Sequence, residues 1–252
     1  MKKGICITPK DMREGLADRL RAEGITLAVL WPEKEKGSVL GLECLARDVK
    51  FGRYHQQMLE LKEKGIDVEY GAYSASSFLP RAFFGVYPYW FRMNEAGVRV
   101  PDANFCPSAE GAADYIAWRA GSVGSILRST THRYHFLPDK EVGALCHCPA
   151  CRHLTPAEQR MIYIRAVLRG LREKDAEAKV CYPVWREDAT LPKCREEEVF
   201  LSCSDEVLEA WETTLFPLFS RVEATVTVED RLQLERLQDR FPEVHDAVLS
   251  KK

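Results

Sequence analysis

The sequence predicts an α/β fold, a TIM-like (β/α) barrel, on three observations. Strand-like and helix-like segments alternate along the whole chain, which indicates a mainly parallel sheet with helices on its outside. The 252 residues match the roughly 250 residues that are typical of an eight-stranded βα barrel. No Gly-x-Gly-x-x-Gly turn follows the first strand, as it would in a dinucleotide-binding open sheet. We therefore expect a single barrel domain over residues 1–252.

Composition excludes several classes of protein. Hydrophobic residues make up 46% of the chain and charged residues 29%, and 36 Lys and Arg face 38 Asp and Glu for a net charge of -2, as in an ordinary globular protein. This balance gives no basic field for nucleic acid. Apolar runs such as Ile25–Trp31 are far shorter than the roughly 20 residues that cross a bilayer. The first residues lack the hydrophobic region of a signal peptide, so we expect a cytoplasmic protein without nucleic-acid or membrane partners.

Capping residues and apolar spacing predict the first elements. Thr8 as N-cap and Pro9 at the first helical position begin a helix, and Gly24 ends it in a left-handed conformation. The apolar face of this helix has four-residue spacing and consists of Met12, Leu16 and Leu20. A second helix spans about 52–64 and ends at Gly65. The strands around these helices are predicted at Gly4–Ile7, Thr26–Trp31 and Asp67–Ala72.

A longer insertion, at about 80–128, separates the third predicted strand from the fourth. It begins with an aromatic-rich segment, continues with a hairpin over Arg92–Val100 around the turn Asn94-Glu95-Ala96-Gly97, and ends in a helix over Ala109–Leu127. The fourth strand is predicted at Arg133–Leu137, and a cysteine-rich loop at 140–155 follows it.

The carboxyl-terminal part continues the same alternation. Thr155-Pro156-Ala157-Glu158 is a capping box that begins a helix. The apolar face of that helix consists of Met161, Ile164, Leu168 and Leu171. A further helix is predicted near Glu206–Leu218 and a last one is broken at Pro242, and the remaining strands are Val180–Val184, Val199–Ser202 and Val222–Val228. About seven strands result, so the strand that closes the barrel is irregular, unrecognised or absent.

Residues at the carboxyl ends of the predicted strands form the candidate site, because the active site of a βα barrel lies at that end. They are aromatic and polar and comprise Trp31, Glu33, Tyr73, Ser74, Ser76, His135, Asp139, Tyr182, Trp185, Arg186 and Glu187. Aromatic faces bordered by carboxylates suit a sugar ring, whose C–H groups stack on the aromatic ring while its hydroxyls take polar partners. The alternative is that Trp31, Tyr73 and Trp185 are ordinary packing aromatics.

Several motifs occur in order between Ile66 and Val184. They are Tyr87-Pro88-Tyr89-Trp90-Phe91-Arg92-Met93-Asn94-Glu95-Ala96-Gly97, Asn104-Phe105-Cys106-Pro107-Ser108, Thr131-His132-Arg133-Tyr134-His135-Phe136-Leu137-Pro138-Asp139, Cys146-His147-Cys148-Pro149-Ala150-Cys151-Arg152 and Leu154-Thr155-Pro156. With these motifs the chain resembles a family of glycoside-hydrolase-like TIM barrels catalogued as a domain of unknown function, which is distantly similar to hexosaminidase and α-glucuronidase barrels. The resemblance implies a carbohydrate-active barrel without identifying the sugar.

The carboxylates predict acid/base hydrolysis of a glycosidic bond. Hexosaminidases end their fourth strand in an aspartate-glutamate pair, whereas Asp139 is followed by Lys140 here. A glycosidase needs two carboxylates, about 5 Å apart for retention or about 6.5–9.5 Å apart for inversion. We therefore expect Asp139 as the general acid and Glu187 as its partner, with Glu33 and Glu69 as alternatives. Two structural roles compete with this assignment: capping of the following loop by Asp139, and a place inside the barrel for Glu69, which lies within its strand.

Six residues are the expected substrate contacts, namely Trp31, Tyr73, His135, Tyr182, Trp185 and Arg92. Asp102 is expected beside Arg92 at the border of the site. The predicted function is a carbohydrate-active hydrolase, and its alternative is a non-catalytic sugar-binding or zinc-stabilised barrel scaffold. A remoter alternative is a sugar isomerase that uses His135 as a base with a bound metal.

The cysteines predict a structural zinc site. Nine of them, an odd number in a chain too long to need disulfide bonds, indicate reduced thiols. Cys146, Cys148 and Cys151 have the spacing Cys-x-Cys-x-x-Cys, which lets three thiolates reach one tetrahedral zinc. We place Cys106 as the fourth ligand, with His147 and His153 as alternatives, and the competing interpretation is that three reduced thiols merely pack a loop. The other cysteines are expected to be buried small apolar residues, namely Cys6, Cys44, Cys181, Cys194 and Cys203.

Overall fold

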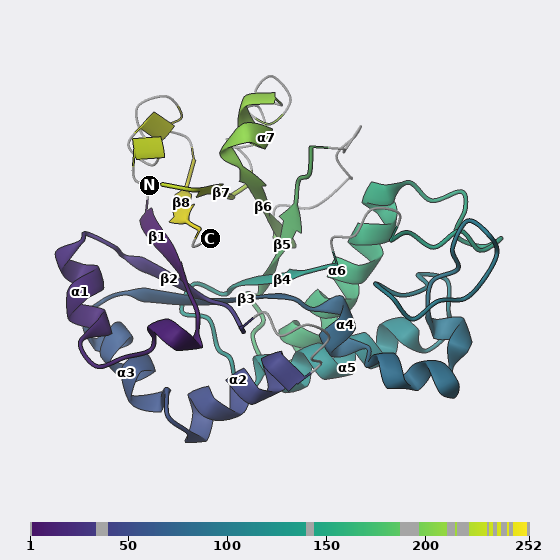
Figure 1. Cartoon of the computed structure of the whole chain (residues 1–252), viewed down its shortest axis with the longest axis horizontal. Coiled ribbons are helices and arrows are strands. Elements are labelled where there is room, and N and C mark those ends of the chain that lie inside the picture. Colours follow the sequence, from purple (N-terminus) through teal and green to yellow (C-terminus); the bar gives the residue numbers. More distant parts are fainter. Residues whose placement is uncertain are drawn as a thin grey trace.

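The computed structural model describes residues 2–33, 40–139, 144–186, 197–210, 215, 222–230, 232–233, 236–237, 241 and 244–250. Within these residues, eight parallel strands form a closed barrel in chain order (Figure 1). The strands are β1 (Lys2–Ile7), β2 (Leu27–Leu30), β3 (Asp67–Tyr73), β4 (Arg133–Leu137), β5 (Lys179–Pro183), β6 (Val199–Ser204), β7 (Ala224–Val228) and β8 (Asp246–Leu249). The predicted TIM-like barrel is confirmed.

The strand that sequence patterns did not identify is β8. It pairs with β1 from Lys2↔Asp246 to Ile5↔Leu249, and with β7 on its other edge. All four of its residues are buried. The segment is short, begins with an aspartate and follows Pro242 closely, and these features hide an apolar strand from a search for continuous hydrophobic runs.

Helices cover the outside of the barrel. They are α1 (Leu16–Ala22), α2 (Leu40–Phe51), α3 (His55–Glu63), α4 (Ala75–Phe78), α5 (Ala112–Gly124), α6 (Pro156–Arg172) and α7 (Asp205–Ala210). The predicted start of α6 is confirmed, because Thr155 N–H donates to Glu158 Oε2 at 2.7 Å and Glu158 N–H donates to Thr155 Oγ1 at 3.2 Å. Within the described residues, no helix combines the length and apolar character that a bilayer crossing requires.

The first predicted helix differs from the structure. Thr8 and Pro9 begin only a short 3-10 helix, Pro9–Asp11, in which the Asp11 carboxylate accepts a hydrogen bond from Thr8 N–H at 2.9 Å. The chain then turns at Gly15, whose φ of 74° lies in the left-handed region, and α1 begins at the next residue. One continuous helix from Pro9 was therefore wrong, whereas the left-handed Gly24, with φ 72°, is confirmed.

The second predicted helix is shorter than expected. It begins at His55 as α3 rather than at Gly52, and α2 precedes it. Although α2 was not predicted, its buried residues follow helical spacing and are Leu42, Leu45, Ala46 and Val49.

The insertion between β3 and β4 contains α4, two 3-10 helices at Arg81–Gly85 and Pro88–Trp90, and α5. The predicted hairpin is reduced to one antiparallel bridge, Met93↔Arg99, across a turn in which Val98 N–H donates to Asn94 Oδ1 at 2.9 Å. In Figure 1 the insertion and the cysteine-rich loop before α6 lie together at the right of the view, away from both chain ends.

Two glycines let α5 and α6 approach closely. A Cβ atom added to Gly121 of α5 would lie 2.8 Å from the Gly170 carbonyl oxygen, and one added to Gly170 of α6 would overlap the Ala117 carbonyl oxygen. Both neighbours are main-chain atoms of helices, which cannot move without shifting the helix. The insertion is therefore held to the barrel through a helix pair that tolerates no side chain at its crossing.

We expect Gly170→Ala to lower the free energy of unfolding by roughly 1–3 kcal/mol, because overpacking against the main chain outweighs the helix propensity that alanine gains. Urea denaturation measures the effect. Gly85→Ala is the matched control, since nothing lies within 4 Å of its added Cβ atom. Equal stability of Gly170→Ala and the wild type would contradict the packing described here.

Candidate functional site

Aromatic side chains lie at the carboxyl-terminal end of the barrel interior. The indole of Trp31, the residue after β2, lies against Gly71 of β3, where a Cβ atom would overlap the ring. The ring centroid of Tyr73 is 5.9 Å from that of Trp31, with an interplanar angle of 53°, and Tyr73 is 44% exposed. The side chains that Trp31 packs on inside the barrel are Leu27, Val29 and Val248. Trp31 and Tyr73 therefore form an aromatic surface at the end where βα-barrel active sites lie.

The indole N–H of Trp31 is a second notable feature of this aromatic surface. It is buried and has no hydrogen-bond partner among the described residues. Buried donors are nearly always paired with protein or ordered water, and an unpaired one is costly. The group lies against Gly71 and is closed to solvent in this structure.

Asp139 lies two residues beyond β4 and is 9% exposed. Its Oδ2 atom accepts hydrogen bonds from Ser76 Oγ at 2.5 Å and from Asn104 N–H at 3.0 Å, and Ser76 N–H lies 3.4 Å from Oδ1. The carboxylate thus faces three donors from the segment that follows β3. This geometry matches the loop-fixing role that competed with the catalytic one in the sequence analysis.

Asn104 completes this arrangement and was not identified from the sequence. Its Oδ1 accepts from Asp139 N–H at 2.9 Å, and its Nδ2 donates to the carbonyl oxygens of Asp139 at 3.0 Å and Ala144 at 3.1 Å. Its φ is 49°, a left-handed conformation that asparagine adopts more readily than most residues. The sequence analysis placed Asn104 in a motif but gave it no role, because the motif does not show which residue its side chain contacts.

His135 lies inside the barrel rather than at its mouth. It is 5% exposed, and its Nε2 is 2.6 Å from Oε2 of Glu69, which is fully buried. Thr131 Oγ1 donates to the other carboxylate oxygen of Glu69 at 2.7 Å, and Arg133 Nε lies 3.8 Å from it. Burial would raise the pKa of Glu69, but the hydrogen bond from His135 and the charge of Arg133 hold that pKa below its ordinary value. Glu69 is thus an interior structural carboxylate.

Tyr182 and Trp185 lie around a buried arginine of α6. Tyr182 is fully buried, and its hydroxyl accepts from Arg160 Nη2 at 3.0 Å. The Arg160 guanidinium carbon lies 4.6 Å from the centroid of the Trp185 ring. The cavity beside Arg160 has a volume of about 20 Å³, room for one water and not for a sugar. Tyr182 therefore contacts α6, and not an open cleft, in this structure.

Arg92 and Asp102 form an ion pair within the insertion. Arg92 Nε donates to Asp102 Oδ1 at 2.7 Å, and Arg92 Nη1 lies 3.4 Å from the Leu145 carbonyl oxygen. Burial would raise the pKa of Asp102, but the hydrogen bonds from Arg92 and Ala103 N–H lower it. The pair joins the insertion to the loop before α6.

Several other acidic residues follow strands. Glu33, after β2, lies 3.5 Å from Lys10 Nζ. Asp205 follows β6 directly and Glu229 follows β7 directly. Glu187, the predicted partner of Asp139, lies outside the described residues, and Arg186 beside it is exposed. The pairing of Asp139 with Glu187 therefore stays a prediction.

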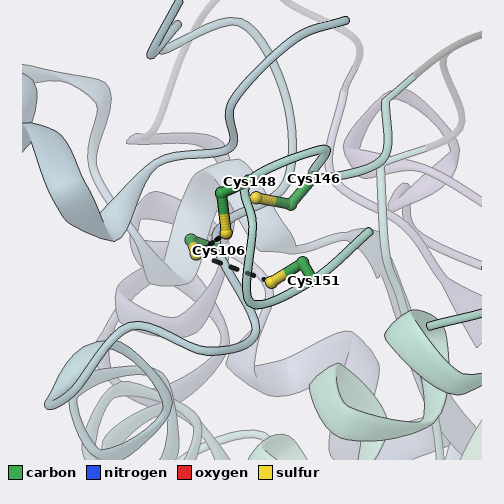
Figure 2. Close-up of side chains that lie close together, drawn as sticks. All are labelled: Cys106, Cys146, Cys148 and Cys151. Carbon is green, nitrogen blue, oxygen red and sulfur yellow. Dashed lines mark hydrogen bonds between the residues drawn. The ribbon is translucent and has the colours of Figure 1, made fainter. Parts of the chain in front are cut away.

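Four cysteines form a buried cluster between the insertion and the loop before α6 (Figure 2). They are Cys106, Cys146, Cys148 and Cys151, all at most 3% exposed, and their Sγ atoms all lie within 4.8 Å of one another. The Cys106 sulfur is 3.8 Å from those of Cys148 and Cys151. Ligands at a Zn–S distance of about 2.3 Å in a tetrahedron lie about 3.8 Å apart, so the cluster fits one zinc ion.

The surroundings of this cysteine cluster donate hydrogen bonds to sulfur. Met93 N–H lies 3.4 Å from Cys146 Sγ, and Ser108 Oγ lies 3.0 Å from Cys151 Sγ. A hydrogen bond with Cys146 lowers the pKa of the Cys106 thiol against the effect of burial, and the same bond together with burial raises the pKa of Cys146 to about 12. The Cys106 thiol therefore gives up its proton more readily than the Cys146 thiol.

The remaining predictions on cysteine and histidine have mixed outcomes. His147 and His153 do not belong to the cysteine cluster, whose fourth member is Cys106. Cys181 and Cys203 are buried as expected, whereas Cys6 and Cys44 are only partly buried. Cys194 lies outside the described residues.

Comparison with known proteins relates the chain to glycoside hydrolases in fold. No family model and no curated protein matches it. Its structure is similar to that of the β-galactosidase from the psychrophilic Marinomonas ef1, with a TM-score of 0.50 and 10% identity over 92% of this chain and 41% of that one. The β-galactosidase of the Antarctic haloarchaeon Halorubrum lacusprofundi has a lower TM-score of 0.46, with 13% identity over 96% of this chain and 41% of that one. A GH10 endoxylanase from a sugarcane soil metagenome has a TM-score of 0.45, with 8% identity over 98% of this chain and 66% of that one.

This chain spans 41% of the length of each β-galactosidase. At such low identity the likeness concerns the fold alone. The chain therefore shares a βα-barrel fold with the first of these enzymes, while its resemblance to the family of unknown function stays a prediction.

The buried Glu69 predicts a specific dependence of stability on pH. Because its folded pKa is lowered, Glu69 stabilises the protein fully above the unfolded pKa of about 4.3, and this contribution is lost as pH falls through the folded pKa. We expect Glu69→Gln to be less stable than the wild type at pH 7 by roughly 3–5 kcal/mol, because His135 and Arg133 lose their partner. The difference should shrink below about pH 4.

Urea denaturation between neutral and acidic pH measures this difference. Glu14→Gln, at an exposed position, is the matched control and should follow the wild type at every pH. A Glu69→Gln difference that stays constant down to acidic pH would show that the carboxylate charge is not stabilising.

Proposed function

We propose that the chain binds carbohydrate at the carboxyl-terminal mouth of its barrel and hydrolyses a glycosidic bond there. The observation that carries the proposal is the aromatic surface of Trp31 and Tyr73 at that end of the closed barrel. A sugar ring stacks its C–H face on such a surface, and the Tyr73 ring, 44% exposed, is accessible for such stacking. The similarity in fold to an enzyme named as a β-galactosidase supports the substrate class by analogy.

Hydrolysis requires a general acid and a second carboxylate. We assign the acid to Asp139 and its partner to Glu187, each in a loop that follows a barrel strand. Ser76 and Asn104 hold the Asp139 carboxylate in one orientation, which supports positioning of an acid.

A second candidate function is a non-catalytic sugar-binding barrel. The hydrogen bonds around Asp139 favour it, because three donors already occupy the carboxylate and its loop-fixing role explains its burial. Both candidates use the same aromatic surface, so binding alone cannot separate them.

Two measurements on the same variants separate the candidates. Calorimetry with a panel of galactosides, xylosides, uronic acids and N-acetylhexosamines measures binding, and hydrolysis of alkyl glycosides, which have poor leaving groups, measures catalysis. We expect Trp31→Ala to weaken binding roughly tenfold, the loss of about 1.4 kcal/mol of stacking. Trp118→Ala is the matched control, because Trp118 is 59% exposed on α5. Asp139→Asn should slow hydrolysis by about 10² to 10⁴ while sparing binding.

Each result decides between defined alternatives. Glu141→Gln belongs in the series, because Glu141 is the other acidic residue in the sequence between Leu137 and Thr155, although it lies outside the described residues. Loss of hydrolysis in Glu141→Gln with full activity in Asp139→Asn would keep the hydrolase and reassign its acid. Binding without turnover in the wild type would favour the non-catalytic barrel. Absence of binding across the panel would overturn the carbohydrate proposal.

We also propose that Cys106, Cys146, Cys148 and Cys151 bind one structural zinc ion. The burial of the four thiols and the 3.8 Å sulfur separations support it. A four-thiolate shell leaves no position for substrate, so such a metal would cross-link the insertion to the loop before α6 and take no part in chemistry.

Zinc content and stability should fall together when a ligand is lost. We expect the wild type purified under reducing conditions to carry one zinc per chain by elemental analysis, and Cys148→Ser to carry much less. Its melting temperature should fall by about 5 °C or more, since a protein of this size loses roughly 2–4 °C per kcal/mol. Cys44→Ser, in α2, is the control and should keep its metal. A metal-free wild type would contradict the proposal.

A further inference from the structure

Arg99 places a positive charge against the cysteine cluster. It belongs to the insertion, where it pairs with Met93 in the antiparallel bridge. Its Nη1 atom donates to the Phe91 carbonyl oxygen at 2.6 Å and lies 3.8 Å from Cys146 Sγ. The same guanidinium is thus fixed by the main chain of one strand of the bridge while it faces the sulfur atoms.

A cysteine cluster that holds zinc is negatively charged, so a nearby cation such as Arg99 would stabilise it. Four thiolates and one zinc ion carry a net double negative charge, and the four cysteines are almost completely buried. A buried net charge is costly unless opposite charge or hydrogen bonds compensate it. The backbone N–H of Met93 and the hydroxyl of Ser108 are neutral donors. Among the described residues that contact a cluster sulfur, Arg99 contributes the cation.

We propose that Arg99 is the counter-charge of the cysteine cluster, a positioning residue that raises its affinity for zinc and slows zinc release without being a ligand. The inference rests on the proposed zinc site and goes beyond it by naming a residue outside the ligand set. Outer-shell partners of metal ligands typically change affinity by roughly 10–100-fold when they are replaced.

A purely structural role for Arg99 is the competing explanation, since its bond to Phe91 would by itself hold the bridge. Arg99→Gln removes the charge and keeps a neutral, although shorter, amide donor, and Arg99→Lys keeps the charge without the guanidinium. Arg152→Gln is the matched control. Arg152 is exposed beside Cys151, and replacing it removes the same charge from the neighbourhood of the cluster.

Zinc affinity is measured by competition with a chromophoric chelator, and zinc release by the rate of chelator colour after dilution into excess chelator. We expect Arg99→Gln to weaken affinity by roughly 10–100-fold and to speed release by a similar factor. Arg99→Lys should lose less affinity, and Arg152→Gln should stay within about threefold of the wild type because an exposed charge is screened.

A double-mutant comparison tests whether Arg99 acts through the metal. In the Cys148→Ser background, which lacks a complete ligand set, Arg99→Gln should leave the melting temperature unchanged. An equal loss of stability in both backgrounds would show that Arg99 acts only on the bridge, and would overturn the inference.

If Arg99→Gln fails to fold, Arg99→Ala with added methylguanidinium replaces it. Recovery of zinc affinity with methylguanidinium, and not with neutral methylurea, supports the counter-charge, and equal behaviour of the two additives overturns it.

The outcomes also distinguish this inference from the zinc proposal. If the wild type binds no zinc, both the zinc site and the role of Arg99 are overturned. A wild type that binds zinc tightly, with Arg99→Gln and Arg152→Gln equal to it, overturns the role of Arg99 alone. Equal weakening in the two arginine variants would assign the effect to net charge and not to contact with Cys146, and would likewise overturn it.

Discussion

Arg133, the first residue of β4, is the side chain on which the barrel interior depends. Its guanidinium bonds Asp246 of β8 and Thr225 of β7, and its Nε lies 3.8 Å from Glu69 of β3. Burial would lower the pKa of the guanidinium, but the charges of Glu69 and Asp246 raise it. A buried charge is stable only with such partners. One cation therefore joins strands from different sides of the barrel, including the short β8 that closes it.

Charged and apolar side chains share the barrel interior. Charged and polar groups gather around the starts of β4 and β8, and the His135–Glu69 bond keeps the interior histidine within that network. The apolar Val29 of β2 lies beside Glu69 of β3, and Trp31 lies two residues further toward the carboxyl-terminal end. Under the proposed function, recognition at the barrel mouth comes from its aromatic surface and from the loops that follow the strands, as is general for βα barrels.

Elements with a local sequence signal could be predicted, whereas elements that depend on contacts between distant parts of the chain could not. Apolar runs and the capping box at Thr155 define the strands and α6, because their signals are local. β8 has four residues and begins with an aspartate, so its identity as a strand depends on pairing with β1. Ligand spacing predicted Cys146, Cys148 and Cys151, and the order of the barrel strands added Cys106. No comparable chemical pattern indicated that Asn104 bonds Asp139, 35 positions away.

The Asn104–Asp139 bonds and the cysteine cluster fasten the same two loops. Cys106 lies two residues after Asn104, and Cys146 lies two residues after Ala144, whose carbonyl oxygen accepts from Asn104. Once the Asn104–Asp139 hydrogen bonds or the cysteine cluster has formed, the chain segment that the other contact must close is shorter. The entropic cost of closing that segment is then lower, because this cost grows with loop length. Metal bound by the four cysteines would therefore stabilise the hydrogen bonds of Asp139 as well as the insertion. If the cluster binds zinc as proposed, the orientation of Asp139 depends on thiols that lie outside the aromatic surface of Trp31 and Tyr73.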